Sequence, residues 1–174
     1  KGIASTAMHM LAERNWLGYD MRVCELWPEF GTNGKDQITI RQVLSHTAGL
    51  LYMPAWEPGT RMEYLAFTFG WIVGEIAHRA DSRPIAQIIW EEICKPLGIE
   101  DMYIGFPAEA EPRVTTLEEP AFVMPGETTL PQPIPNCILP LHAWVNRRDV
   151  HQACIPASNG IMTAHSIEKP KYLM

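Results

Sequence analysis

The chain has 174 residues, of which 47% are hydrophobic and 20% charged, and its formal net charge at pH 7 is −6. This composition is typical of a folded globular protein of one domain, and it excludes a disordered chain, a collagen-like repeat and a coiled coil. The negative charge argues against nucleic acid and anionic lipid surfaces as partners. No apolar run reaches the roughly 20 residues that span a bilayer, so we expect no membrane span.

Apolar residues recur at helical spacing in four stretches of the chain. The expected helices cover residues 3–14, 40–45, 67–79 and 85–94. Thr39 has a side chain suited to the N-cap of the second helix, which is expected to end at Gly49. We interpret His46, in the last turn of that helix, as a side chain favoured by the helix dipole. The sequence therefore predicts a mainly helical protein.

Strand signals are few, and proline breaks the second half of the chain. The candidate strands are residues 102–104 and 121–124. Eight of the 15 prolines lie within residues 107–143. Because proline lacks an N–H and restricts the residue before it, we expect this range to form a long irregular loop. Beyond it, the Asn159-Gly160 turn is expected to lead into a last helical stretch that Pro170 ends.

The four cysteines, Cys24, Cys94, Cys137 and Cys154, form no C-x-x-C pair and have no histidine at zinc-ligand spacing. We interpret them as small buried or half-buried thiols, because a chain this rich in apolar residues does not need a disulfide framework. Free thiols favour a reducing compartment such as the cytoplasm. The sequence has no metal-ligand cluster and no glycine-rich phosphate loop, so we expect neither metal nor cofactor.

Two short motifs have the residue types of a catalytic pair but are interpreted as coincidences. Ser45 and His46 are adjacent, and neighbours on a helix do not face each other as a nucleophile and its base must. Ser166 and Lys169 have the S-x-x-K spacing, at which two side chains can share one helix face. Pro170 follows, however, and disfavours helical geometry at Lys169, so the lysine is not held against the serine.

Several segments together resemble one family. They are residues 1–7, 27–30, 38–50, 58–64, 68–76, 96–99 and 157–164. Each segment is a modest signal alone, but in this order along the chain they resemble the serine β-lactamase-related superfamily. This superfamily includes the class C β-lactamases, the penicillin-binding DD-peptidases and the family VIII carboxylesterases, and the last of these is the most similar.

The resemblance implies an α+β fold of the β-lactamase/transpeptidase type, of which this chain is an incomplete copy. Residues 1–174 are expected to form a partial domain that covers mainly the helical part and lacks most of the central antiparallel sheet. The family's nucleophilic serine would stand three residues before Lys1, outside this sequence. No counterpart of the family's third motif is found, and only residues 51–57 connect two motifs that a long stretch separates in relatives.

The resemblance also assigns residues to a site. Lys1 corresponds to the lysine that activates the nucleophile, although at a fraying chain end we expect its amine to stay protonated near its ordinary pKa of about 10.4. Tyr64 corresponds to the catalytic tyrosine, which acts as general base and then acid; otherwise it is a half-buried tyrosine whose hydroxyl bonds to backbone. Ala66 stands where β-lactamases have the asparagine that contacts the substrate amide, which favours an esterase pocket. Asn159 and Gly160 either border the pocket or form a plain turn.

The expected function is that of a serine hydrolase, a carboxylesterase acting on a small-molecule ester through an acyl-enzyme. A β-lactamase or DD-peptidase is the alternative within the enzymes. Because the nucleophile lies outside the sequence, we expect the chain alone to be inactive. It could instead be a non-catalytic interaction module derived from the family, or a piece that does not fold alone. The oligomeric state stays open.

Overall fold

A computed structural model describes residues 1–50, 57–118 and 140–170 of the chain. Its α-helices are α1 (Gly2–Glu13), α2 (Val23–Leu26), α3 (Ile40–Leu44), α4 (Thr68–Asp81), α5 (Ile85–Ile89), α6 (Leu141–Val145), α7 (Arg148–Gln152) and α8 (Ala164–Glu168). Three shorter turns of helix are η1 (Pro28–Gly31), η2 (Trp90–Cys94) and η3 (Ala108–Arg113). The two strands of the described residues are β1 (Met102–Ile104) and β2 (Gly160–Met162).

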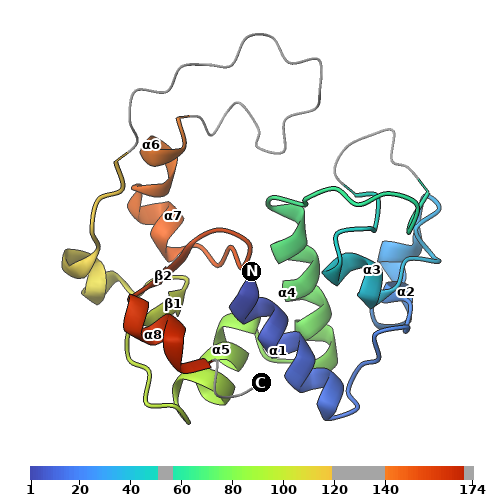
Figure 1. Ribbon diagram of the computed structural model, residues 1–174, viewed down its shortest axis with the longest axis horizontal. Helices are drawn as coiled ribbons and strands as arrows, with labels where there is room; N and C mark the ends of the chain where they lie inside the picture. The colour runs from blue at the N-terminus through green and yellow to red at the C-terminus, as the bar shows by residue number, and fades with distance from the viewer. Residues whose placement is uncertain (51–56, 119–139, 171–174) are drawn as a thin grey trace.

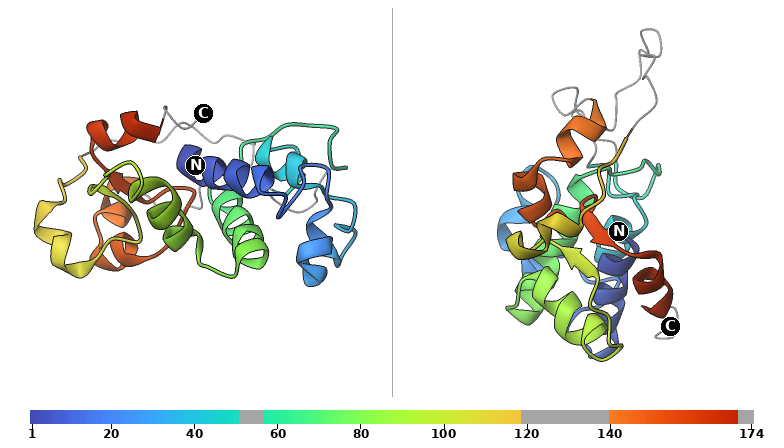
Figure 2. Two further views of the ribbon diagram at one scale, coloured as in Figure 1. Left: turned by 90° about the horizontal axis from the view of Figure 1, so that it is seen from below. Right: turned by 90° about the vertical axis from the view of Figure 1, so that its left-hand side faces the viewer.

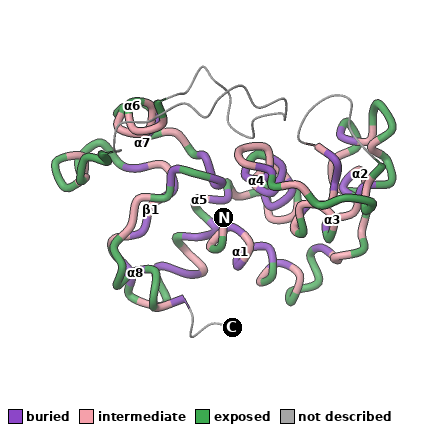
Figure 3. The backbone as a smooth tube through the Cα atoms, turned by 45° about the horizontal axis from the view of Figure 1, so that its top comes forward, coloured by how far each residue is buried: buried purple, intermediate pink, exposed green. Residues whose placement is uncertain are grey.

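Helices α1 and α4 lie side by side at the centre of the molecule (Figure 1). Met8 and Leu11 of α1 and Phe69 and Ile76 of α4 are all essentially inaccessible to solvent. Burying such a side chain contributes about 1.5–3 kcal/mol, so this contact is a large part of the hydrophobic core. Buried residues concentrate along α1, α4 and α5, while the outer ends of the molecule are exposed (Figure 3).

The predicted helices are confirmed, with ends that shift by one or two residues except in α5. Thr39 caps α3 as expected, because its hydroxyl accepts a hydrogen bond from the Gln42 N–H at 3.3 Å. The Gln42 side chain in turn accepts one from the Thr39 N–H at 3.0 Å, which completes a capping box. The helix expected over 85–94 begins as α5 and then widens into the π-helical turn η2.

The two strands form one antiparallel pair, in which Tyr103 lies opposite Ile161. Strand β1 confirms the strand predicted at residues 102–104. The expectation that the Asn159-Gly160 turn leads directly into a helix was wrong. The chain first forms β2, and Thr163 then caps α8 by accepting a hydrogen bond from the Ser166 N–H at 3.2 Å. A strand of three residues is too short to show an alternating pattern, and its partner is distant in sequence.

The range 107–143 is only partly described. Its described parts hold η3 and the first turns of α6, so the expectation of irregular structure throughout was wrong at both ends. The candidate strand 121–124 lies outside the described residues. Helices α2 and α7 were not predicted, because four or five residues do not span enough turns for helical periodicity to appear.

The described cysteines differ in burial, and the described helices are short. Cys94 is a free thiol and buried, and burial raises its pKa to about 11. Cys24 is half-buried and Cys154 is exposed, which corrects the expectation of burial for the latter, while Cys137 lies outside the described residues. The longest described helix, α4, has 14 residues, and none of the helices described could cross a bilayer.

Two groups of elements lie on either side of α1 and α4 (Figures 1 and 2). One group contains α2 and α3, and the other contains the strand pair with α6, α7 and α8, with α4 next to α1 between them. Lys1 therefore lies at the middle of the molecule, where distant parts of the sequence come together.

Candidate active site

Lys1 is the N-cap of α1, and its side chain joins the segment before α4 to the segment before β2. The amine donates hydrogen bonds to the carbonyl oxygen of Ala66, before α4, and to that of Ala157, near β2, the latter at 3.3 Å. Its Nζ also lies 4.7 Å from the centroid of the Tyr64 ring and 5.4 Å from that of Phe69. These are distances at which an aromatic face attracts a cation.

The expectation of a solvated, fraying Lys1 was wrong. Two carbonyls and two aromatic rings surround the amine, so it loses part of its hydration. Burial lowers the pKa of the Lys1 side chain below its ordinary value of 10.5, because the charged form is the one that desolvation disfavours. An amine with a lowered pKa can be neutral more often, which is the form able to accept a proton from a hydroxyl.

Tyr64 is beside Lys1 and open to solvent. Its side chain is 57% exposed, which does not fit the half-buried packing role that was the alternative. The Tyr64 ring packs against the ring of His46, with the two centroids 5.1 Å apart, as well as against the Lys1 amine. The structure therefore brings together the two residues to which the resemblance assigned catalysis.

His46 is the site residue that sequence reasoning missed. It lies beyond α3, after the C-cap Ser45, in the left-handed region with φ of 61°. Its Nδ1 accepts a hydrogen bond from the Leu65 N–H at 3.1 Å, and its carbonyl oxygen accepts one from the Glu63 N–H at 3.0 Å. The explanation by the helix dipole was wrong, since burial first, and the charge of Lys1 second, lower the pKa of this imidazole.

Gly70 of α4 permits the approach that completes the Lys1 site. A Cβ at this position would lie 2.2 Å from the backbone nitrogen of Ala157 and 2.6 Å from its Cβ. Only a glycine allows the two backbones so near each other. This approach places the Ala157 carbonyl within reach of Lys1.

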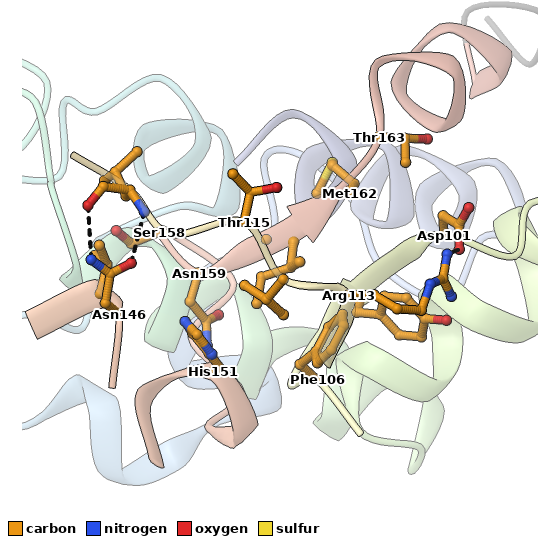
Figure 4. A pocket seen from close by; sticks show the side chains of 16 residues that line it. Asp101, Phe106, Arg113, Thr115, Asn146, His151, Ser158, Asn159, Met162 and Thr163 are labelled. Carbon is orange, nitrogen blue, oxygen red and sulfur yellow. Dashed lines mark hydrogen bonds and ion pairs between the residues drawn. The ribbon is translucent and has the colours of Figure 1, made fainter. Parts of the chain in front are cut away.

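Asn159 borders a hollow that Lys1 does not line, whereas Gly160 borders that hollow and the Lys1 hollow as well. The Asn159 side chain accepts a hydrogen bond from the Ile155 N–H and donates to the carbonyls of Val150 and Ala153, so its amide is used by the local backbone. It lines a hollow of about 510 Å³ together with His151 (Figure 4). Gly160 lines this hollow and also a second one, of about 570 Å³, which Lys1 lines.

The two motifs interpreted as coincidences do not form catalytic pairs. The Ser45 hydroxyl bonds to that of Thr47 at 2.9 Å. Lys169 donates to the carbonyl of Gly98 at 2.9 Å, while the Ser166 hydroxyl pairs with that of Thr163. Within the described residues, no three His, Cys, Asp or Glu side chains are close enough to hold a metal ion.

The family model for Beta-lactamase matches residues 1–169 of this chain. The chain belongs to the beta-lactamase family. Among curated proteins it is 32% identical, over 142 residues, to "Esterase/beta-lactamase LipL" of Mycobacterium tuberculosis (strain ATCC 25618 / H37Rv). That match covers 69% of this chain and 33% of LipL.

Solved structures show the same fold. A penicillin-binding protein homologue from Caulobacter crescentus superposes with a TM-score of 0.81 at 30% identity, over 97% of this chain and 51% of that one. A family VIII carboxylesterase superposes with a TM-score of 0.63 at 34% identity, over 67% of this chain and 39% of that one. The fold is thus the β-lactamase/transpeptidase type, and the chain spans about half or less of the length of these relatives.

One signal in the sequence could have indicated the role of His46. The residue belongs to the segment 38–50, and Tyr64 closes the segment 58–64, both of which carry the family resemblance. Helical periodicity relates residues three or four apart, whereas His46 and Leu65 are 19 apart. This contact links residues far apart in sequence, so local patterns did not reveal it.

Proposed function

We propose that these residues are the proton-transfer part of a serine hydrolase that cleaves carboxylic esters through an acyl-enzyme. The nucleophile would be a serine three residues before Lys1 in a longer chain. The observation that carries the proposal is the position of the Lys1 amine, which is partly buried between two carbonyls and faces the Tyr64 ring. The similarity to an esterase/beta-lactamase and to a family VIII carboxylesterase supports the same reaction class.

In the proposed reaction, the serine oxygen attacks the ester carbonyl as its proton passes to the neutral Lys1 amine, which transfers it onward through the Tyr64 hydroxyl. The carbon–oxygen bond to the alcohol then breaks, and Tyr64 returns the proton to the departing alkoxide. Water attacks the acyl-enzyme in the second half, with Tyr64 again accepting and returning a proton. The sum is ester plus water giving acid plus alcohol, with no external oxidant, reductant or cofactor.

Ala66 favours esters over β-lactams. Its carbonyl holds Lys1, and its methyl side chain has no group that could donate a hydrogen bond to a substrate amide. An ester does not need that donor at its leaving group, whereas a lactam bound in the manner of the β-lactamases loses a contact here. A β-lactamase or peptidase activity is the alternative that the experiment below separates. We also propose that Gly160 borders the substrate pocket and that Asn159 contributes to binding by fixing the turn before Gly160.

The test compares p-nitrophenyl butyrate with nitrocefin as substrates. In the natural longer chain that carries the serine, we expect ester hydrolysis to exceed nitrocefin hydrolysis, and Tyr64→Phe to lower kcat by about 100-fold or more. Residues 1–174 alone should hydrolyse neither substrate. Full activity in the Tyr64→Phe variant, or hydrolysis by residues 1–174 that this substitution abolishes, would contradict the proposed roles.

A non-catalytic interaction module is the second candidate, and the exposed apolar side chains favour it. Met62 is 74% exposed and Trp71 is 56% exposed, and this candidate requires such side chains to join into one contiguous apolar patch, which is what marks a partner surface. Size-exclusion chromatography with light scattering tests it. A stable monomer over the micromolar range counts against this candidate.

A further inference from the structure

We infer that His46 is a positioning residue that holds the backbone on both sides of Tyr64 and so sets the tyrosine ring against Lys1. The catalytic meaning of this inference depends on the proposed function, but the holding contact does not. The two bonds to His46 come from the N–H groups of Glu63 and Leu65, which flank Tyr64 directly. Fixing the residues before and after a side chain restricts where that side chain can lie.

The contacts of the His46 ring fix its own position as well. The ring stacks on Phe69 with centroids 4.8 Å apart, and Phe69 belongs to the buried face of α4. Tyr64 packs against the same imidazole at 5.1 Å. His46 therefore connects the Tyr64 segment to the central helix, and Lys1 approaches both aromatic rings from α1.

The bond from Leu65 requires one tautomer of His46. Nδ1 can accept a hydrogen only when it carries none, so the ring proton of the neutral imidazole must be on Nε2. A second proton, on Nδ1, would break this bond and place two positive charges beside each other, because Lys1 is the charged group facing the ring. An Nδ1–H tautomer would therefore rule out the holding contact.

The backbone of His46 allows the contact to be separated from strain. With φ of 61°, the residue occupies a conformation that glycine and asparagine adopt far more readily than alanine. His46→Gly removes the acceptor and relieves the backbone. His46→Asn keeps a side-chain acceptor and tolerates the backbone. His46→Ala loses both, so the three variants form a matched series.

The first experiment measures hydrogen exchange of the Leu65 amide and the tautomer of His46 by NMR, in the natural chain that carries residues 1–174. We expect the Nε2–H tautomer in the unmodified protein. We expect Leu65 exchange to become about 10-fold faster in His46→Gly and to return to within about threefold in His46→Asn, while core amides of α4 are unchanged. An Nδ1–H tautomer, or Leu65 exchange that His46→Gly leaves unaltered, overturns the inference. If His46→Gly does not fold, Leu65 exchange in His46→Ala replaces it, and an Nδ1–H tautomer in the unmodified protein still overturns the inference.

The second experiment measures ester hydrolysis in the same series. We expect His46→Gly to lower kcat by about 10-fold with little change in KM, and His46→Asn to restore most of it, since a positioning loss acts on the transition state. If hydrolysis is absent from every variant but the exchange results hold, the proposed function fails and the positioning inference stands. If hydrolysis is present and His46→Gly affects neither kcat nor Leu65 exchange, the positioning inference fails alone.

Discussion

The Lys1–Tyr64 site and the Asn159 turn are both built from polar residues that the sequence singles out. They differ in how far along the chain their hydrogen-bond partners lie. Asn159 is 7% exposed, and its amide bonds only to backbone groups four to nine residues away. Lys1 bonds to carbonyls 65 and 156 residues away, and Tyr64 beside it is 57% exposed. A polar side chain whose hydrogen bonds all go to its own turn stabilises that turn. A site that brings distant segments together and is open to solvent can contact a substrate.

The largest expected effect tests the junction on which the Lys1 site depends. Gly70→Ala places a Cβ 2.2 Å from the Ala157 nitrogen, so we expect it to lower the free energy of unfolding by about 3 kcal/mol. The matched control is Gly74→Ala on the same helix, where a Cβ would meet Ile85 and Pro156 at 3.6 Å, an ordinary contact. That substitution should stabilise by up to about 1 kcal/mol. Equal urea midpoints for the two variants would refute the close approach.

The next prediction compares the stability cost of losing the Asn159 side chain with that of altering Tyr64. Asn159→Ala leaves the Ile155 N–H and two carbonyls without their partner, and we expect a loss of about 2 kcal/mol of unfolding free energy. Tyr64→Phe, at an exposed side chain, should change it by less than about 0.5 kcal/mol. Urea denaturation of both variants measures the difference. Similar losses would mean that Tyr64 is as structural as Asn159.

A smaller effect concerns the ion pairs that fix the far end of α1. Glu92 accepts hydrogen bonds from Arg14 at 2.5 Å and from Arg83 at 2.9 Å, and these lower the pKa of its carboxyl from 4.5 to about 2. A carboxyl with a depressed folded-state pKa stabilises above its unfolded pKa and loses that contribution as the pH falls through the folded value. We expect Glu92→Gln to cost about 1 kcal/mol at pH 7.

The pH dependence is the control for this prediction. The difference in unfolding free energy between Glu92→Gln and the unmodified protein should be constant near neutrality and shrink as the pH falls from about 4.5 toward 2. Urea denaturation at several pH values measures it. A difference that grows toward low pH would show that the ion pairs do not stabilise the fold.

The smallest expected effect separates the two lysines that donate to carbonyls. Lys169 bonds to the Gly98 carbonyl at 2.9 Å, in a contact exposed to solvent. We expect Lys169→Gln to change ester hydrolysis by less than about twofold and unfolding free energy by less than about 0.5 kcal/mol. A large fall in kcat would restore the S-x-x-K motif of residues 166–169 as a catalytic candidate.

Features that depend on residues close together in sequence could be predicted, whereas features that depend on long-range contacts could not. Helices α1 and α4, the Thr39 cap and strand β1 follow from local periodicity and short-range hydrogen bonds, and the sequence predicted them. Strand β2 was missed because its pairing with β1 is long-range and only three residues long. Lys1 and Tyr64 were identified through the family resemblance.

The environment of the site was not predictable in the same way. The burial of Lys1 depends on Ala157 and on the glycine that admits it, 156 and 69 positions along the chain. The role of His46 depends on a left-handed backbone at a non-glycine residue, which helical periodicity does not reveal. Local reasoning therefore described Lys1 as solvated and His46 as a helix-end side chain, and both descriptions were wrong.

The central claim is that Lys1 lies in a partly buried site facing Tyr64, where its amine gives up a proton more easily than on a surface. The most direct test is an NMR titration of the Lys1 side chain, followed at its 13Cε. We expect the pKa of this amine to lie below its ordinary value of 10.5. A value at or above 10.5 would contradict it, because a fully hydrated Lys1 could not be the buried amine on which the proposed proton transfer depends.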